Sequence, residues 1–222
     1  MASARRHASV SIETAADIRR GVEYLRGACP VLRMMHDRTG DPPLRRFEAG
    51  FGGLARIVVG QQLSIASAAA IWSRLETSLA NVTPARLLAM SHDGLKGVGL
   101  STAKIRTLVA LAEAIEAGKL DLAALRTADD ADVSKALVAI HGIGPWTADI
   151  YVMFCLGRRD AWAAGDLALQ VGVARAFDLG PRLGPGELLT VAERWRPWRG
   201  VAARLIWADY ARPRDAAVPQ KP

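Results

Sequence analysis

Apolar residues return every three or four positions along most of this chain, and this spacing constrains the fold more than any other feature. Runs that alternate apolar and polar residues, as half-buried strands do, are nearly absent. The architecture is therefore predicted to be all-α. The predicted helical segments are 13–27, 46–60, 64–79, 84–90, 101–117, 129–140, 145–156, 166–178, 185–195 and 199–211.

Several of these segments open with residues that are typical of helix N-termini. Side-chain oxygens of Ser, Thr and Asp accept hydrogen bonds from the first backbone N–H groups, and Pro is favoured at the first helical position. The start signals are Thr83-Pro84, Ser101, Asp129, Gly144-Pro145, Asp166 and Gly184-Pro185. The Pro/Gly-rich stretches 40–43, 180–186 and 212–222 are predicted to be loops or tails.

The charge balance favours an anionic partner. The formal net charge is +7 and the sequence pI is about 10, which ranks nucleic acid first and an acidic membrane surface second. A composition rich in Ala and Arg is also what a GC-rich genome produces, so charge alone leaves both readings open.

Cysteine usage and hydropathy suggest a cytoplasmic protein without a cofactor. Cys29 and Cys155 are far apart, and no Cys/His cluster has the spacing of a zinc or iron–sulfur site. The first residues lack the apolar run of a signal peptide. The longest uncharged stretch, 57–73, is interrupted by two glutamines and is slightly too short for a membrane span.

The stretch "ALVAIHGIGPWTADIYVMF" predicts two helices joined by a very tight turn. Gly142 and Gly144 tolerate backbone angles that other residues resist, and Pro145 suits the first turn of the second helix. Ile143 is expected to anchor the hairpin by packing inward. Backbone N–H groups at such a helix start can bind a phosphate, although a plain helix corner is the commoner meaning of a Gly-x-Gly turn.

A second stretch resembles this hairpin. "GVGLSTAKI" (97–105) and "GIGPWTADI" (142–150) agree at Gly, Gly, Thr, Ala and Ile. The agreement predicts a repeated hairpin, although helix–turn–helix corners in general reuse Gly and Thr.

Four motifs in order carry a resemblance to a known family. They are "VVGQQLSIASAAAIWSRL", "LVAIHGIGPWTADIYVM", "WAAGDLALQVGVARAF" and "AERWRPWRGVAARLIWADY". Together they resemble the 3-methyladenine DNA glycosylase II family of the helix–hairpin–helix DNA glycosylase superfamily, from about residue 50 to 211. The resemblance implies a two-lobed helical fold with the active site in the cleft between the lobes. The lobes are expected at 1–60 with 157–222 and at 61–156, in a compact form without the β domain that some bacterial members carry.

The resemblance places the family's catalytic carboxylate at Asp166. Cleavage of a base from deoxyribose builds positive charge on the sugar, and a fixed carboxylate stabilises that charge. From the sequence alone, an N-cap of the helix that follows is the stronger interpretation of Asp166. Asp149 is the alternative acid, although a solvated charge is its commoner identity. Gly165 stands where many members have Pro or Asp.

The resemblance also implies a monofunctional enzyme. Members that also cleave the strand carry a lysine two residues after the second hairpin glycine, and here that residue is Trp146. The expected activity is hydrolysis that removes alkylated purines, 3-methyladenine and 7-methylguanine, from duplex DNA during base excision repair. The expected enzyme is a monomer.

The remaining site residues follow the family's motifs. Trp146 and Trp207 match pocket positions, where an indole face attracts a positively charged alkylated base. Tyr151 is a further pocket candidate, and the sequence leaves open whether it lies in the pocket or in the core. The family's pocket tyrosines fall on Ile150 and Leu167 here, which should alter the pocket's breadth of substrate. Trp72, Trp195 and Trp198 are expected in the core.

The family's intercalating position, which fills the gap left by a flipped base, falls on Gln62, while Gln61 is expected to satisfy buried backbone groups. The hairpin residues Gly142, Ile143, Gly144 and Thr147 are expected at the DNA backbone. The resemblance also implies a monovalent cation at the hairpin carbonyls near His141 and Ile143.

Two other functions compete with this one. A non-catalytic helix–hairpin–helix protein would bind DNA without needing Asp166, Trp146 and Trp207 together. A glycosylase for other damaged bases would keep the acid and change the pocket, and the missing lysine argues against the type that removes oxidised purines.

Overall fold

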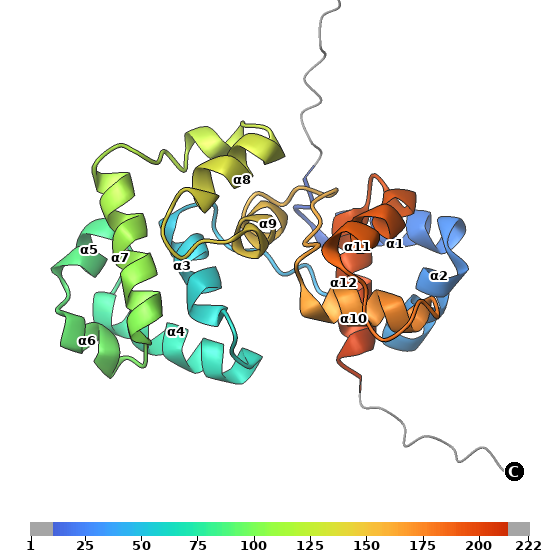
Figure 1. Cartoon of the computed structure of the whole chain (residues 1–222), viewed down its shortest axis with the longest axis horizontal. Coiled ribbons are helices and arrows are strands. Elements are labelled where there is room, and N and C mark those ends of the chain that lie inside the picture. The colour runs from blue at the N-terminus through green and yellow to red at the C-terminus, as the bar shows by residue number, and fades with distance from the viewer. Residues whose placement is uncertain (1–10, 213–222) are drawn as a thin grey trace, which may run out of the picture. The chain divides into compact units, whose positions relative to one another are not determined.

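Helices make up almost all of the regular structure in the computed structural model, which describes residues 11–212 (Figure 1). Within that range the β structure amounts to an isolated bridge between Ser11 and Arg158. The all-α prediction is therefore confirmed. None of the helices in this range has both the length and the apolar character needed to cross a membrane.

The chain divides into two compact units, each built from segments that are distant in sequence. Among the described residues, the first unit holds Ser11 and 45–161, and the second holds 12–44 and 162–212. The expected boundary after residue 60 differs from the observed one, because the helix at 51–60 packs against three other helices of the first unit. Residues 157–161 also belong to the first unit, whereas they were expected in the other lobe.

The first unit is organised around α3 (Phe51–Gly60), which packs against α4, α7 and α9. Its apolar face buries Leu54, Val58 and Val59 completely. Around it α5 packs against α7, and α8 against α9. The other helices of this unit are α4 (Ile65–Leu79), α5 (Pro84–Ala89), α6 (His92–Gly97), α7 (Thr102–Glu116), the 3₁₀ turn Ala124–Arg126, α8 (Asp130–Val138) and α9 (Pro145–Phe154).

The second unit is organised around α12 (Arg199–Tyr210), which packs against α1, α2 and α10. Trp195 is fully buried, and its ring lies 5.4 Å from Trp162 and 5.8 Å from Phe177. The core roles expected for Trp195, and for Trp72 in the first unit, are thereby confirmed, while Trp198 is half-buried. The other helices are α1 (Ala15–Ala28), α2 (Pro30–Thr39), α10 (Leu167–Ala176), α11 (Pro185–Ala192) and the 3₁₀ turn Glu193–Trp195.

Most predicted helix starts are observed, and the departures have local causes. Thr83, Ser101 and Asp166 cap their helices with side-chain oxygens. The segment predicted at 46–60 starts only at Phe51. Residues 46–48 have no regular structure, 49–50 form a bend, and the Phe47 N–H donates to the Phe154 carbonyl at 2.9 Å. Two helices, α2 and α6, were not predicted. The helix α6 is six residues long with two glycines, too short for an apolar period to appear.

Candidate active site and DNA interface

Asp166 lies at the N-terminus of α10 in the second unit, and its side chain is held by two hydrogen bonds. Its Oδ1 accepts from the backbone N–H of Leu169 at 3.0 Å and from the indole Nε1–H of Trp207 at 2.9 Å. The second bond joins α10 to α12, which pack together in this unit (Figure 1). The N-cap interpretation is confirmed. The capping oxygen also accepts the hydrogen bond from Trp207, which was predicted at the site from the sequence.

A buried glutamine supports the turn that precedes Asp166. The Asp166 N–H closes this turn by donating to the Ala163 carbonyl at 3.0 Å. Gln170, 1% exposed, donates from Nε2 to the Ala164 carbonyl at 2.8 Å and accepts from Arg182 Nε at 2.7 Å. Neither Gln170 nor Arg182 was predicted to support the site. A polar residue on the apolar face of the "LALQVGV" helix was the one signal in the sequence.

The hairpin between α8 and α9 has the expected tight turn. Gly142 has φ +81°, and a Cβ there would lie 1.8 Å from the Thr107 Oγ1, so both the backbone and the neighbour on α7 require glycine. Ile143 is 3% exposed, which confirms that it packs inward. Its N–H donates to the Ile140 carbonyl at 3.1 Å. The turn is therefore built against the first unit's core.

The start of α9 is left open by the residues that precede it. Gly144 is the N-cap and provides no side-chain hydrogen bond, and Pro145 follows at the first helical position. A Cβ on Gly144 would meet nothing within 4 Å among the described residues. Backbone N–H groups at such a helix start attract anions. The monovalent cation at the His141 and Ile143 carbonyls stays a prediction.

The similar stretch at 97–105 forms a different turn. Gly97, which corresponds to Gly142, is helical, whereas Gly142 has a positive φ. Gly99, which corresponds to Gly144, has φ +100°, whereas Gly144 has φ −96°. Ser101 caps α7, and Arg74 Nε donates to the Val98 carbonyl at 2.9 Å. The prediction of a repeated hairpin is therefore wrong at the backbone level, and residues 97–105 form a helix corner that Ser101 and Arg74 stabilise with these hydrogen bonds.

Thr147 was expected at the DNA backbone, and the structure corrects this for its side chain. Thr147 is 2% exposed, and its Oγ1 accepts a hydrogen bond from Gln61 Nε2 at 2.8 Å. It is the third residue of α9, so its backbone N–H remains part of the open helix start while its hydroxyl faces inward. Gln61 is half-buried and bonds this hydroxyl, where a backbone partner was expected.

Gln62 lies in the short segment between α3 and α4 and is exposed. Its φ is +55°, a left-handed conformation that costs a non-glycine residue about 1 kcal/mol or more. Strain of this kind persists where the surroundings hold it and often marks a functional position. The intercalating role of Gln62 stays a prediction.

Tyr151 does not line a pocket. Its side chain has no exposed surface, and its hydroxyl has no hydrogen-bond partner among the described residues, so burial raises its pKa. It is a core residue of α9, because the helix turns this position toward the interior of its own unit. Trp146 is half-buried at the second position of α9. Ile150 is buried, and Leu167 is 55% exposed.

Asp149 is not the solvent-exposed charge that is the commoner role of an Asp on a helix. It is half-buried on α9, and burial, with a smaller contribution from the charge of Asp130, raises its pKa to about 7. Asp130 itself lies 3.8 Å from the Nε of Arg158. Asp149 therefore holds a proton over part of the physiological pH range.

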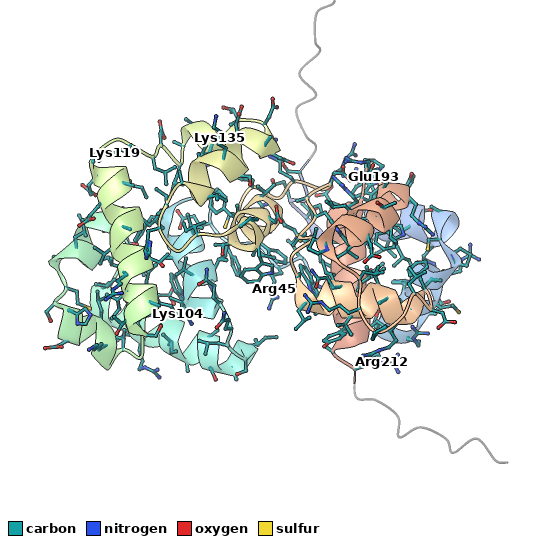
Figure 2. All side chains as sticks on the ribbon, in the orientation of Figure 1. Arg45, Lys104, Lys119, Lys135, Glu193 and Arg212 are labelled. Atoms are coloured by element: carbon teal, nitrogen blue, oxygen red, sulfur yellow. The ribbon has the colours of Figure 1, made fainter. Side chains whose placement is uncertain are left out.

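The lysine of the second Gly-x-Gly stretch has a structural partner. Lys104, labelled in Figure 2, donates from Nζ to the Val59 carbonyl at the end of α3 at 2.7 Å. Burial lowers its pKa. This bond assigns Lys104 to the packing of α7 against α3.

The predicted site residues thus fall into two sets. Asp166 and Trp207 are brought into direct contact in the second unit. The open start of α9, with Trp146, and the segment carrying Gln62 belong to the first unit, where Gln61 and Thr147 join them.

Comparisons with known proteins identify the family of this chain. Residues 55–199 match the model of the HhH-GPD superfamily of base excision DNA repair proteins. DNA-3-methyladenine glycosylase 1 of Schizosaccharomyces pombe is 31% identical over 172 residues, which cover 72% of this chain and 74% of that protein. DNA-3-methyladenine glycosylase 2 of Escherichia coli is 28% identical over 172 residues, covering 72% of this chain and 56% of that protein.

A solved structure extends the likeness to the fold. The 3-methyladenine DNA glycosylase of Schizosaccharomyces pombe, in complex with abasic DNA, has a TM-score of 0.78 at 27% identity, covering 87% of this chain and 100% of that one. The chain spans about half the length of the first curated relatives that it matches, 43% and 56%. It belongs to the HhH-GPD superfamily of base excision DNA repair proteins and, within it, to the DNA-3-methyladenine glycosylases.

Proposed function

We propose that this protein is a monofunctional DNA glycosylase that hydrolyses the N-glycosidic bond of alkylated purines in duplex DNA. The observation that carries the proposal is the carboxylate of Asp166, held by a backbone N–H and an indole N–H at a helix start. A pure DNA-binding module could use Asp166 as a helix cap, but it does not need Asp166, Trp146 and Trp207 together.

Asp166 stabilises the positive charge that develops on the deoxyribose. The bond between C1′ and the purine nitrogen breaks, and the electron pair leaves with the base. Water adds its oxygen to C1′ and releases a proton. Because both donors reach Oδ1, the carboxylate is oriented before the reaction, and preorganised charge is the most effective kind.

Alkylated purines suit this site because they carry positive charge before cleavage. The bond-breaking electron pair neutralises that charge, so a strong general acid is unnecessary. Indole faces attract such a cation by roughly 0.5–2 kcal/mol per contact. We assign Trp146 and Trp207 to the damaged base. The hydrogen bond to Asp166 uses the Nε1 edge of Trp207, and the base would stack on a ring face.

DNA binding is assigned to the first unit. The open start of α9, with Gly142, Ile143 and Gly144, would bind the backbone phosphates, which position the duplex without reading its sequence. The target base would leave the duplex, and Gln62 would fill the gap. Trp146 replaces the lysine that a strand-cleaving enzyme needs, so the product is an abasic site on an intact strand. The enzyme is proposed to act as a monomer.

The test is release of free base from methylated duplex DNA by the wild type and Asp166→Asn. Asn is as good an N-cap as Asp, so the variant keeps the fold and loses only the charge. We expect 3-methyladenine or 7-methylguanine from the wild type and at least a hundredfold slower release from the variant, on the order of a lost transition-state contact.

Other outcomes would separate the alternatives. DNA binding by the wild type without base release would favour a non-catalytic binding protein. Release of a different damaged base would keep the chemistry and change the substrate. A strand break that borohydride traps as a protein–DNA adduct would overturn the monofunctional assignment.

A further inference from the structure

Two hydrogen bonds stabilise the place where α3 ends and the segment 61–64, which leads to α4, begins. Gln61 Nε2 donates to Thr147 Oγ1 on α9 at 2.8 Å, across 86 positions of sequence. Lys104 Nζ on α7 donates to the Val59 carbonyl, at the end of α3, at 2.7 Å (Figure 2). Both bonds lie within the first unit.

The tip of the same segment is exposed. Gln62 is exposed with φ +55°, and Leu63 is 39% exposed. The chain re-enters regular structure at Ser64, which caps α4 by accepting from the Ser67 N–H at 3.1 Å. A strained, projecting residue thus stands directly beside one whose side chain is fixed.

Thr147 connects the start of this segment to the hairpin. It is the third residue of α9, within the first turn that Gly144 leaves open. Its side chain is 2% exposed and holds Gln61, while its backbone belongs to the helix start assigned to the phosphates. Thr147 therefore links the segment that carries Gln62 to the start of α9, through a buried side chain that contacts no DNA in this scheme.

We propose that the hydrogen bond from Gln61 to Thr147 is a positioning device that fixes Gln62 relative to the hairpin. When phosphates bind the start of α9, the tip at Gln62 then meets the duplex at a set distance. Gln61 and Thr147 contact neither the base nor the sugar in this scheme, so they are positioning residues. The inference rests on the proposed function, because it concerns the step that removes a base from the stack.

A positioning role predicts different effects on duplex and single-stranded DNA, whereas a merely structural role predicts the same effect on both. A filled gap is needed only when the damaged base must leave a duplex, whose stacking and pairing cost a few kcal/mol to break. A single strand has no such gap. Loss of the hydrogen bond should therefore slow base release from duplex DNA and spare release from single-stranded DNA.

The experiment uses Gln61→Ala, Thr147→Val and the double variant, with Thr147→Ser as the matched control. Valine keeps the shape of threonine and removes the hydroxyl, whereas serine keeps the hydroxyl. Single-turnover release of 7-methylguanine is measured on one oligonucleotide, alone and paired with its complement. Thermal melting checks that each variant is folded.

We expect Gln61→Ala and Thr147→Val to slow release from the duplex about tenfold, the worth of one buried hydrogen bond. Release from the single strand should stay within about twofold, which corresponds to less than 0.5 kcal/mol. Thr147→Ser should behave as the wild type. The double variant should be no slower than either single variant, because both changes remove the same bond.

Equal slowing on both substrates would overturn the proposal and leave the bond a purely structural role. So would a double variant whose losses multiply, because the two residues would then act independently. A wild type that releases no base from either substrate would instead overturn the proposed function, and the inference with it.

Discussion

The helices α9 and α10 differ in what is available to accept hydrogen bonds from the first backbone N–H groups. Each helix begins with backbone N–H groups that have no partner within the helix. At α10 the Asp166 side chain accepts from one of them, and the same oxygen accepts from Trp207. At α9 the residue in the equivalent place is Gly144, which offers no side chain. The start of α10 is therefore occupied by the carboxylate of its own cap, whereas the start of α9 is suited to an anion from another molecule.

The acidic residues of the two helices also differ. Asp166 is the cap of α10, where its Oδ1 accepts hydrogen bonds from the Leu169 and Trp207 N–H groups. Asp149 lies in the interior of α9, beyond its first turn, where burial raises its pKa to about 7. We therefore assign the counter-charge of the reaction to Asp166, and we expect Asp149 to affect stability through the proton that it holds.

The largest effect is expected from the charge at the start of α10. Asp166→Asn should slow base release by about 10²–10³-fold, because the oxocarbenium-like charge loses its fixed counter-charge. Affinity for undamaged duplex DNA should not fall, since the hairpin is untouched. Base release in single turnover and DNA binding by fluorescence anisotropy measure the two quantities. A parallel loss of affinity would mean that the two helix starts do not divide the work in this way.

The hydrogen bond from Trp207 gives the next largest effect. Trp207→Phe keeps an aromatic ring and removes the N–H that donates to Asp166 Oδ1. A hydrogen bond to a charged group contributes about 1.5–3 kcal/mol, so the single-turnover rate should fall about tenfold or more. The affinity for a duplex with a stable abasic-site analogue should change less than the rate. If affinity alone changed, Trp207 would serve as a stacking surface without orienting the acid.

The open start of α9 can be closed by a single methyl group. In Gly144→Ala the added Cβ meets nothing within 4 Å in the described range 11–212, and φ is ordinary, so the melting temperature should stay the same. The methyl group would stand where a phosphate approaches, and affinity for duplex DNA should fall about tenfold, or 1.4 kcal/mol.

Gly97→Ala is the matched control for this change. Gly97 occupies the position corresponding to Gly142 in the similar stretch 97–105, lies in α6 and also has open space around a Cβ. It should leave both melting and DNA binding as they are. Weaker DNA binding by Gly97→Ala would show that the corner at 97–105 also contacts DNA.

The positions of these helix starts could be predicted from the sequence, whereas the hydrogen-bond partners and the burial of their side chains could not. Capping is local, so Asp166 and the Gly144-Pro145 pair are visible within a few residues. The partner of Asp166 is 41 positions away, and that of Thr147 is 86 positions away. No local pattern specifies which side of a short apolar helix faces a neighbour. For this reason Thr147 was predicted at the DNA backbone and Tyr151 in the base pocket, whereas both side chains are buried.

The two similar stretches show the same limit. Sequence identity at both glycines predicted one backbone geometry, but the positive φ falls on the first glycine in 142–150 and on the second in 97–105. The neighbours account for the difference. Thr107 packs against Gly142, whereas Arg74 reaches the Val98 carbonyl and Ser101 caps the next helix. Turn geometry here depends in part on Thr107 and Arg74, which lie outside the two stretches.

The smallest effect is expected from Asp149, and it concerns stability rather than rate. An unfolded Asp has a pKa near 3.9, and burial raises that of folded Asp149 to about 7. Between about pH 4 and 7 the folded state therefore holds a proton that the unfolded state has lost. The contribution of this group to stability falls as the pH rises through that window and is constant above it.

Asp149→Asn removes this dependence while keeping the shape of the side chain. Since asparagine carries no charge at any pH, the variant should melt higher than the wild type at pH 8 and nearly level with it at about pH 4, below the window in which the proton matters. Circular dichroism at both pH values measures the difference, which isolates Asp149 from the other titrating groups. Base release should persist, because the counter-charge of the reaction is assigned to α10. An equal shift in melting at both pH values would show that the proton on Asp149 is not involved, and loss of base release would transfer the acid's role from Asp166 to α9.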